Sequence, residues 1–470
     1  MMAKHLVDFD WKLKYLFQLF SLRPHRPYPS RFLSFVNPVI NYNLKPRPIP
    51  EIMKLENSQY GFIFSPQLTT VLQVFDKYKY EIRLCGGAVR DILLGKTPTD
   101  LDFATTATPD EMIEMMAKEN IRIVNKGGLK HGTVTSHVDG VNFELTTLRI
   151  DVVTDGRHAD VEYTKDWALD AGRRDLTVNS MFLGMDGTVY DYFNGYEDLK
   201  KRQIRFVGDP KLRITEDYLR ILRYFRFYGR LATAPNLHDE YILEAIREKG
   251  SGLKQISGER IWSELHKILE GNYGPDIMRT ILKLGLSPYI GLPEQPNVEE
   301  FDKVINRTKG LKLQPITMLI PFLKDAHDMN ELNNRLKFRV FDRDLGLFIV
   351  QSRDEKWTPD TIKINKIKII QNPTKQAVMK EYIEQLLKYN NDRTILEEFE
   401  KWTPLKFPIT GNMIKNHGVK DGKKIGIILR KLIEYWADDD FQTDIEELLN
   451  LIPKAEDELC HNFKNSKKNT

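Results

Sequence analysis

The spacing of hydrophobic residues divides the chain into two regions. In the first, short apolar or alternating runs such as "YEIRLCGG", "TDLDFAT" and "GVNFELTTLRID" predict β-strands, and "AVRDILLG" predicts a short amphipathic helix. After about Asn194 the spacing is that of long amphipathic helices, with few strand signals. We therefore expect an α/β region followed by an all-α region.

One helix in the second region is bounded clearly. Ser257 is placed to open, and Gly271 to close, the helix predicted for "SGERIWSELHKILEG". We expect Trp262, Leu265 and Ile268 of this helix to lie in the hydrophobic core rather than at a ligand site.

The N-terminal segment has a different composition from the remainder. No Asp or Glu occurs from residue 11 to residue 50, and basic residues are spread among Leu, Phe, Tyr and Ser. This composition is typical of a mitochondrial transit peptide, although Asp8 and Asp10 count against it. The alternative is a disordered, Pro-rich tail without a targeting role. Met53 follows directly and could start a shorter, cytosolic or nuclear product.

Composition excludes several classes of protein. The 70 Lys and Arg residues barely exceed the 66 Asp and Glu residues, so the net charge of +4 does not predict a uniformly basic nucleic-acid-binding surface. Cys85 and Cys460 lie far apart in the sequence, which excludes a disulfide framework or a cysteine zinc cluster. No apolar run approaches the roughly 20 residues that span a bilayer, so we expect no membrane association.

Two glycines follow the strand predicted for "YEIRLCGG". Gly86 and Gly87 would let the backbone approach a ligand closely, and the first N–H groups of the next helix offer an anion site. Arg90, one turn into that helix, would add positive charge. The pair is a candidate to hold a triphosphate, but such glycine pairs are more often only tight turns.

Asp100 and Asp102 are the strongest candidates for metal ligands. Alternation along the strand predicted for "TDLDFAT" places both side chains on one face. Two carboxylates this close repel each other, and Mg²⁺ relieves the repulsion while keeping positions open for phosphate oxygens. A solvated turn is the alternative for an isolated D-x-D sequence.

Glu144 is a candidate third ligand. It lies between Phe143 and Leu145 in a predicted strand and therefore faces away from both. The alternative is an exposed glutamate paired with Arg149 or a lysine. Three carboxylates around two Mg²⁺ ions, about 3.5–4 Å apart, would support nucleotidyl transfer by in-line displacement.

Three motifs in their order give the chain a family resemblance. "GGAVRDILLGKTPTDLDFATTATP", "RRDLTVNSMF" and "EDYLRILRYFRF" resemble the motifs of class II tRNA nucleotidyltransferases, the CCA-adding enzymes, most closely the eukaryotic ones. The similarity extends from about residue 60 to the C-terminus. Bacterial-type poly(A) polymerases share the first motifs, so a poly(A) polymerase remains an alternative, as does a catalytically silent RNA-binding protein.

The resemblance implies a fold class and a division into domains. The expected fold is an α/β nucleotidyltransferase head, a mixed sheet with helices, followed by an all-α neck, body and tail. The expected segments are a transit-peptide extension (1–54), the head (55–194), a neck that recognises the base (195–285), the body (286–372) and a tRNA-binding tail (373–470). The implied partners are CTP, ATP, and the acceptor end and elbow of tRNA, in the mitochondrion.

The stretch "ITEDYLRILRYFRFYGRL" predicts a helix that begins at Thr215, with Glu216 and Asp217 in its first turn. Charged residues recur every three positions, so we expect successive ones to be neighbours on one side of the helix. These residues are Asp217, Arg220, Arg223 and Arg226. The plain alternative is an ion pair between Asp217 and Arg220 on a solvated face.

Asp217 and Arg220 could also select a base. Cytosine and adenine each present an amino donor beside an acceptor ring nitrogen, whereas uracil and guanine present the opposite polarity. A carboxylate that accepts and a guanidinium that donates match only the first pair, and each contact is worth about 1–3 kcal/mol of discrimination. The resemblance implies this role for both residues and places Arg223 and Arg226 near the phosphates or the base.

The motif "RRDLTVNSMF" predicts a second set of nucleotide contacts. Asp175 and Asn179 are four residues apart on an expected helix and could hold each other, while Arg173 or Arg174 reaches phosphate. The resemblance implies ribose recognition; a capped helix with a salt bridge is the alternative. The preceding segment (151–167), with Asp155, Arg157 and His158, predicts a mobile loop, which the resemblance links to switching between C and A addition.

The stretch "ITGNMIKNHGVKDGKKIGIILRKLIEYW" (409–436) predicts an RNA-binding region. Glycines at 411, 418, 422 and 426 indicate turns followed by a helix. The candidate phosphate contacts are Lys415, Lys420, Lys423, Lys424 and Arg430. The alternative is a solvated basic face, whereas the resemblance implies contact with the tRNA elbow.

Overall fold

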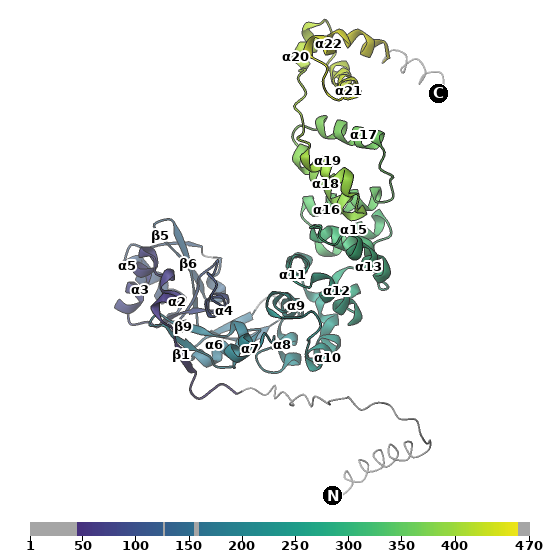
Figure 1. Cartoon of the computed structure of the whole chain (residues 1–470). Helices are drawn as coiled ribbons and strands as arrows, with labels where there is room; N and C mark the ends of the chain where they lie inside the picture. The colour runs from purple at the N-terminus through teal and green to yellow at the C-terminus, as the bar shows by residue number, and fades with distance from the viewer. Residues whose placement is uncertain (1–44, 126, 155–158, 459–470) are drawn as a thin grey trace, which may run out of the picture. The chain divides into compact units, whose positions relative to one another are not determined.

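The computed structural model describes residues 45–125, 127–154 and 159–458. Most of the proposed transit peptide therefore lies outside the described residues, as do Asp155, Arg157 and His158. The described part begins with an α/β region and continues as helices to its C-terminal end (Figure 1), as the hydrophobic pattern predicts.

The α/β head contains a mixed sheet of eight strands in the order β1-β10-β9-β2-β3-β6-β5-β4. The strands are β1 (Glu51–Lys54), β2 (Ile82–Cys85), β3 (Asp102–Thr105), β4 (Arg122–Asn125), β5 (Thr133–Val138), β6 (Val141–Thr147), β9 (Phe182–Gly184) and β10 (Thr188–Tyr190). All neighbours are antiparallel except β3 and β6, which are parallel. This one parallel pair sets the two strands that carry the candidate metal ligands side by side.

Alternation along β3 and β6 gives the sheet two different faces. Phe103 and Leu145 are fully buried in the core that includes α3 and α5. Asp102 and Glu144 precede them and so face the other way. The head helices are α2 (Asn57–Tyr60), α3 (Pro66–Lys77), α4 (Gly87–Leu93), α5 (Pro109–Lys118), α6 (Trp167–Arg173) and α7 (Gly195–Lys201), with 3₁₀ turns η1 (Gly61–Ile63), η2 (Leu129–His131) and η3 (Thr177–Asn179).

The head begins earlier than the predicted end of the N-terminal extension at residue 54. Strand β1 pairs with β10 at the edge of the sheet. The backbone N–H of Arg47 donates to the Tyr192 carbonyl at 3.0 Å, and the backbone N–H of Asp191 donates to the Pro50 carbonyl at 2.8 Å. At least residues 47–54 therefore belong to the folded head.

The segment predicted as a mobile loop at 151–167 is largely regular. Strands β7 (Arg149–Thr154) and β8 (Ala159–Tyr163) pair as an antiparallel two-stranded sheet. This prediction is wrong for the strands, whose sequences "RIDVVT" and "ADVEY" contain β-branched residues that favour strands.

The helices after the head form a continuous core with it as far as α18. The neck helices are α8 (Pro210–Glu216), α9 (Arg220–Leu231), α10 (Glu240–Lys249), α11 (Gly258–Glu270) and α12 (Gly274–Lys283), with η4 (Gly250–Gln255). Helix α11 begins after Ser257 and ends before Gly271, as predicted. Its Trp262, Leu265 and Ile268 are buried, which confirms their place in the core.

The remaining helices contribute to three apolar cores. They are α13 (Val298–Arg307), α14 (Pro315–Leu319), α15 (Ala326–Leu336), α16 (Val340–Ser352), α17 (Pro359–Ile370), α18 (Gln376–Asn390), α19 (Arg393–Lys401), α20 (Gly411–Asn416), α21 (Gly422–Asp438) and α22 (Ile445–Asn450), with η5 (Ser287–Ile290) and η6 (Ile320–Phe322). Helix α18 packs on α16, where the ring of Tyr382 contacts those of Phe341 and Phe348. Helices α20 to α22 share a separate core around Leu432 and Trp436.

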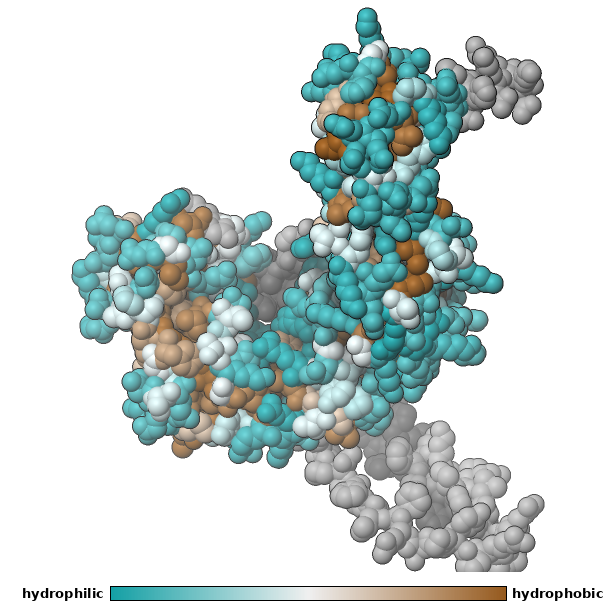
Figure 2. Space-filling view, turned by 45° about the horizontal axis from the view of Figure 1, so that its top comes forward, coloured by the Kyte–Doolittle hydropathy of each residue, from teal (hydrophilic) through white to brown (hydrophobic). Residues whose placement is uncertain are grey.

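The surface shown in Figure 2 is mainly hydrophilic, with apolar residues in smaller patches between polar ones. Within the described residues, no helix has the length and apolar character needed to cross a membrane.

Candidate active site

The glycine turn after β2 needs a glycine at one position. Gly86 has φ +66° and ψ −126°, a combination that residues with a Cβ rarely adopt. A Cβ there would also come within 3.3 Å of Arg174 Nη1. Gly86 and Gly87 both line a cavity formed by head and neck residues, so bare backbone meets the cavity at this turn.

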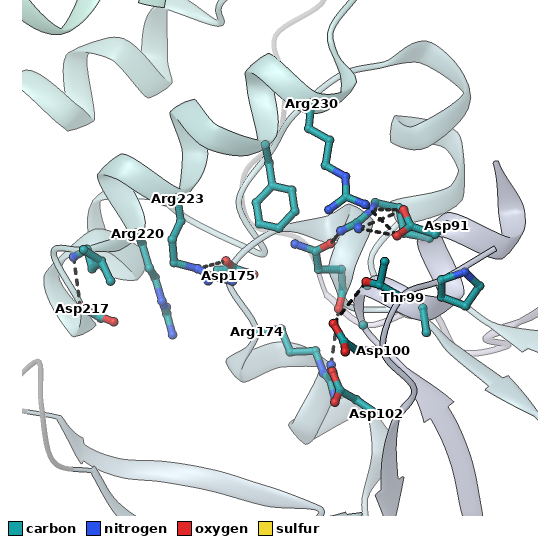
Figure 3. Close-up of a pocket in the computed structure, with 18 of the residues that line it drawn as sticks. Asp91, Thr99, Asp100, Asp102, Arg174, Asp175, Asp217, Arg220, Arg223 and Arg230 are labelled. Carbon is teal, nitrogen blue, oxygen red and sulfur yellow. Dashed lines mark hydrogen bonds and ion pairs between the residues drawn. The ribbon is translucent and has the colours of Figure 1, made fainter. Parts of the chain in front are cut away.

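Asp100 and Asp102 line the same cavity (Figure 3), but they do not lie in one strand. Strand β3 begins at Asp102, so the prediction of a strand through Asp100 is wrong. Asp100 instead accepts a hydrogen bond from the Thr99 hydroxyl at 3.2 Å. The side chain of Asp102 is open to the cavity, yet desolvation by the surrounding walls, followed by the charges of Glu144 and Asp100, raises its pKa.

Glu144 lies on β6 directly opposite Asp102 in the parallel register. It is exposed while Phe143 and Leu145 are buried, which confirms its predicted direction. Among the described residues Glu144 forms no ion pair, so the alternative pairing with Arg149 is not observed. The register thus places Glu144 beside Asp102, although Glu144 is not among the residues that line the cavity.

Asp100 and Asp102, with Glu144 opposite Asp102, suit a divalent cation, although the ligand atoms of the three do not all lie within 4.8 Å of one another. None of Asp100, Asp102 and Glu144 has an ion-pair partner among the described residues, and their mutual repulsion contributes to the raised pKa of Asp102. Hard oxygen ligands with uncompensated charge are what Mg²⁺ binds in proteins. The donor set therefore fits a divalent cation.

The 173–179 segment differs from its prediction. Helix α6 ends at Arg173, and Asp175 and Asn179 do not share a helix, because Arg174 adopts extended backbone angles at the helix C-terminus. Asp175 accepts from Arg223 Nε at 2.6 Å, and Asn179 accepts from Arg90. Although burial disfavours the charged form, the guanidinium of Arg223 lowers the pKa of Asp175.

Arg173 and Arg174 are held by one buried carboxylate. Asp170 is 1% exposed and accepts from Arg173 at 2.8 Å and from Arg174 at 3.0 Å. Both arginines line the cavity. Because one negative charge faces two positive charges, the wall keeps a net positive charge for an anion.

The expected helix from Thr215 is two helices. Thr215 lies near the end of α8, where its hydroxyl donates to the Lys211 carbonyl, so it is not an N-cap. Asp217 follows α8 with φ −152° and ψ 105°, and α9 begins only at Arg220. The extended residue between the helices turns the Asp217 side chain toward the cavity (Figure 3).

Asp217 and Arg220 do not form the ion pair that was the plain alternative. Asp217 accepts from Arg260 Nη2 at 2.9 Å and from the Leu219 N–H at 3.1 Å. Arg220 donates from Nη1 to Glu216 at 2.6 Å. Each side chain is thus fixed by a different partner, and both line the cavity.

The remaining donors of Arg220 show which edge faces a ligand. Its Nη1 also donates to the Arg213 carbonyl at 3.1 Å, and its Nη2 to the Arg173 carbonyl at 3.0 Å. Among the described residues the Nε–H has no acceptor. That donor is available to a bound molecule.

Helix α9 presents a stripe that differs from the predicted one. The residues of α9 in the cavity wall are Arg220, Arg223, Phe227 and Arg230. A step of three residues drifts by about 60° around a helix of 3.6 residues per turn, so three steps of this kind leave one face. Arg226 accordingly points to α11, where it pairs with Glu264 at 3.0 Å, and does not line the cavity.

Sequence reasoning missed Asp91, Arg230 and Arg260. Asp91 is buried, accepts from Arg90, and accepts from Arg230 Nη2 at 2.8 Å, which links α4 to α9. Arg230 lies seven residues after Arg223, a helical spacing that could have identified it. Arg260 is 43 residues from its partner Asp217, so no local signal identifies it.

The cavity has a volume of about 500 Å³, within the range of ligand sites. Seven arginines and five aspartates line it, so its wall has an excess of positive charge. Figure 3 shows Asp100 and Asp102 on one side and Asp217 with Arg220 on the other. The arrangement suits a ligand whose negatively charged groups lie beside Asp100 and Asp102 and whose hydrogen-bonding edge lies beside Asp217 and Arg220.

The basic residues predicted to bind RNA lie on exposed surface. They are Lys415 in α20, Lys420 before α21, and Lys423, Lys424 and Arg430 in α21. None of them forms an ion pair within the part of the chain that the structure describes. Of the predicted turns, one occurs at Gly418, whereas Gly411 and Gly422 are the first residues of α20 and α21 and Gly426 lies inside α21.

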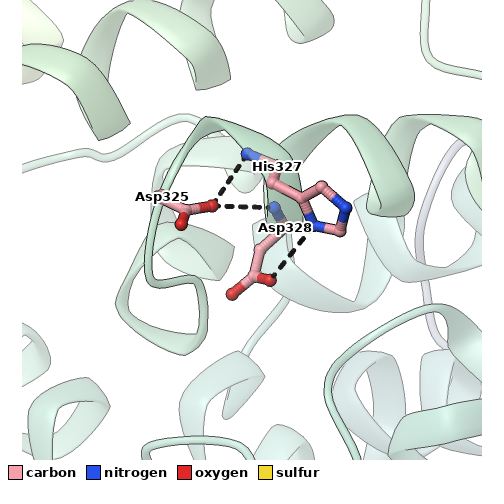
Figure 4. Close-up of side chains that lie close together, drawn as sticks. All are labelled: Asp325, His327 and Asp328. Carbon is pink, nitrogen blue, oxygen red and sulfur yellow. Dashed lines mark hydrogen bonds and ion pairs between the residues drawn. The ribbon is translucent and has the colours of Figure 1, made fainter.

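A second group of possible metal ligands has a structural explanation. Among the described residues, only Asp325, His327 and Asp328 have ligand atoms all within 4.8 Å of one another (Figure 4). Asp325 caps α15 by accepting from the backbone N–H groups of His327 at 2.8 Å and Asp328 at 3.2 Å. The cap accounts for this cluster without an ion.

Comparisons with known proteins agree with the geometry. Residues 82–205 match the family model "Poly A polymerase head domain", and residues 239–297 match "Probable RNA and SrmB- binding site of polymerase A". The chain is 48% identical over 407 residues to the "CCA tRNA nucleotidyltransferase 1, mitochondrial" of Homo sapiens, covering 86% of this chain and 93% of that protein.

Solved structures share the fold at lower identity. The Bacillus stearothermophilus CCA-adding enzyme in complex with CTP is 21% identical with a TM-score of 0.62, covering 87% of this chain and all of that chain. The Thermotoga maritima CCA-adding enzyme complexed with tRNA is 21% identical with a TM-score of 0.57, covering 86% of this chain and all of that chain.

Proposed function

The chain belongs to the CCA tRNA nucleotidyltransferase family, and we propose that it adds C, C and A to the 3′ end of tRNA from CTP and ATP without a nucleic-acid template. The observation that carries this proposal is the shared cavity of Asp100 and Asp102 with Asp217 and Arg220. Acids suited to a metal lie at one side, and a donor–acceptor pair suited to a base edge lies at the other.

The proposed reaction forms one bond and breaks one bond. The 3′-oxygen of the RNA attacks the α-phosphorus of the nucleotide, and pyrophosphate leaves. Asp100, Asp102 and Glu144 would hold the divalent cations, which we propose are two Mg²⁺ ions. When bound, such ions activate the attacking hydroxyl and stabilise the charge of the leaving group.

The remaining lining residues bind and orient the nucleotide. Arg173 and Arg174, fixed by Asp170, would contact the phosphates beside the open backbone of Gly86 and Gly87. Asp175 and Asn179 are proposed for the ribose, and Arg223, which donates to Asp175, is proposed to lie near the phosphates or the base. Arg90 holds Asn179 and Asp91 and would add charge near the phosphates.

Base selection is assigned to Asp217 and Arg220. A carboxylate oxygen of Asp217 would accept from the exocyclic amino group of cytosine or adenine, and the Nε–H of Arg220 would donate to a ring nitrogen. Uracil and guanine present the opposite polarity at this edge. Arg226 lies behind the wall, so we propose that it acts through its pair with Glu264 rather than on the nucleotide.

The exposed basic residues of α20 and α21 are proposed to contact the tRNA backbone. Sequence-independent binding uses lysine and arginine side chains at phosphates. The five residues Lys415, Lys420, Lys423, Lys424 and Arg430 have no competing ion pair among the described residues.

The same comparisons support a mitochondrial location, because relatives that are 46% and 48% identical to this chain carry that description. A second, cytosolic or nuclear product from Met53 remains a proposal. Such a product would lack Glu51 and Ile52 of β1, together with the backbone contacts of residues 47–50.

A direct test separates the proposed activity from its rivals. The protein is incubated with Mg²⁺, tRNA that lacks its terminal CCA, and each nucleotide separately or together. We expect CTP to add two residues and CTP with ATP to add three. Repeated ATP addition without use of CTP would indicate the poly(A) polymerase that the head-domain match also allows. No extension at all would indicate an RNA-binding protein.

A further inference from the structure

The backbone of Asp217 does not by itself fix the plane of its carboxylate, so other groups must hold it. The residue lies between α8 and α9, outside regular helix geometry, with its side chain 25% exposed. The last torsion of an aspartate is broad, so an isolated carboxylate rotates readily. A group that reads a base edge must present a fixed plane.

Two contacts fix that plane from opposite ends. The Leu219 N–H donates to Oδ1 at 3.1 Å, and Arg260 Nη2 donates to Oδ2 at 2.9 Å. An ionised carboxylate has about four acceptor positions, so both oxygens keep capacity for another donor. The two contacts therefore orient Asp217 without saturating it.

Arg260 reaches Asp217 from a different part of the chain. It is the third residue of α11, and α11 packs against α9. Its side chain is 36% exposed and lines the cavity. One turn along α11, Glu264 already ties this helix to α9 through Arg226. The pair of Arg226 and Glu264 therefore joins the two helices independently of Arg260, and the contact of Arg260 with Asp217 acts on the carboxylate.

We propose that Arg260 is a positioning residue that sets the nucleotide selectivity of the cavity by orienting Asp217. This inference rests on the proposed function and adds a residue that acts through Asp217. Loss of the guanidinium leaves Oδ2 without its donor, so the carboxylate turns and accepts less well from cytosine or adenine. Discrimination against uracil then falls, because the wrong base no longer meets a fixed acceptor.

The test compares Arg260→Gln with the unchanged protein in single-nucleotide addition to tRNA lacking CCA. The measured quantity is the ratio of kcat/KM for CTP to kcat/KM for UTP. We expect this ratio to fall about 10-fold or more in Arg260→Gln, mainly through a higher KM for CTP. General loss of structure would lower both values of kcat/KM together and leave the ratio unchanged.

Matched variants make the result specific. Arg279→Gln removes a comparable neck arginine, which pairs with Asp276 and Asp302 and does not line the cavity, and should leave the ratio unchanged. Arg260→Lys keeps the charge but not the planar group, and should give an intermediate ratio. In an Asp217→Ala background, Arg260→Gln should have no further effect on the ratio.

The outcomes distinguish this inference from the proposed function. An unchanged ratio in Arg260→Gln, or an equal fall in Arg279→Gln, would overturn the role of Arg260. If Arg260→Gln does not fold, an unchanged ratio in Arg260→Lys would overturn it instead. If the unchanged protein itself adds neither C nor A, the proposed function fails first.

Discussion

At the scale of single residues, the site depends on carboxylates that have no ion-pair partner among the described residues. Asp100, Asp102 and Glu144 have no ion pair among the described residues. The arginines of the cavity wall, in contrast, are held by Asp170, Asp175 and Glu216. Figure 3 shows the contact between Arg223 and Asp175. The ion pairs fix the orientation of the arginine side chains, while the three acids keep negative charge that no protein cation compensates. This contrast favours a metal at the acids rather than a structural salt bridge.

Replacing Asp102 with Asn should separate metal binding from folding. We expect Mg²⁺ to raise the melting temperature of the unchanged protein, because a ligand stabilises the state that binds it. Asp102→Asn should lose that response and at least about 100-fold in kcat, since the metal supplies several kcal/mol of charge stabilisation. Asp110→Asn, at an exposed carboxylate of α5, is the control. An equal Mg²⁺ response in both variants would contradict the assignment.

His238 gives a prediction about pH. Burial against Tyr224 and Tyr228 lowers its pKa to about 4, below its ordinary value of 6.5. Between these values the unfolded chain binds the proton and the folded chain does not, so stability falls as pH decreases through this window. At pH 5 the loss from this group is at most about 2 kcal/mol, at 1.36 kcal/mol for each pKa unit.

The measurement for His238 is urea denaturation at pH 7 and pH 5. His238→Phe keeps an aromatic ring but cannot bind a proton, so its free energy of unfolding should change less between the two pH values. Identical changes in the variant and the unchanged protein would show that His238 titrates normally in the folded state.

At the scale of elements, alternation along strands was predictable and helix rotation was not. The position of Glu144 between Phe143 and Leu145 predicted its direction, because strand alternation depends on local geometry. The break at Asp217 and the turn of Arg226 toward Glu264 depend on packing between α9 and α11, which no local pattern encodes. The glycine turn was predicted, whereas Arg260 could not be, since its partner is distant in sequence.

The turn between β2 and α4 supports a paired prediction. Gly86→Ala places a Cβ at φ +66° and near Arg174, and strain of this kind costs about 1–3 kcal/mol. Gly87→Ala has ordinary backbone angles and only a 3.5 Å contact with Arg90, so its cost should be smaller. Urea denaturation compares the two variants. A Gly87→Ala protein that is the less stable of the two would contradict this account.

At the scale of the whole molecule, the N-terminal boundary affects the sheet. A chain that starts at Met53 loses half of β1 and the hydrogen bonds of Arg47 and Pro50. At about 1 kcal/mol for each hydrogen bond, we expect it to be about 2–3 kcal/mol less stable than a chain that starts at Lys45. Chemical denaturation of both proteins measures the difference. Equal stabilities would show that the residues before Met53 are dispensable.

Removing charge from the proposed RNA-binding surface should change the binding of tRNA but not the use of the nucleotide. Replacing Lys420, Lys423 and Lys424 with Ala should raise the KM for tRNA. The replacement should also make tRNA binding less dependent on salt. The slope of log binding constant against log salt concentration should become shallower by about 0.7–0.9 for each phosphate that the protein no longer neutralises. The kcat and the CTP to UTP ratio should stay unchanged, because these residues do not line the cavity.

A control with the same charge change uses lysines that already form ion pairs. Lys118, Lys200 and Lys303 are exposed and pair with glutamates on their own helices. Their replacement with Ala should leave the KM for tRNA nearly unchanged. Equal effects of the two triple variants would indicate a general charge effect rather than a binding surface.

The most direct test of the central claim is a crystal structure with CTP and Mn²⁺ measured at the manganese absorption edge. We predict anomalous density at the carboxylates of Asp100 and Asp102 beside the phosphates, with the cytosine edge on Asp217 and Arg220. Manganese away from these acids, or a base that touches neither Asp217 nor Arg220, would contradict the account.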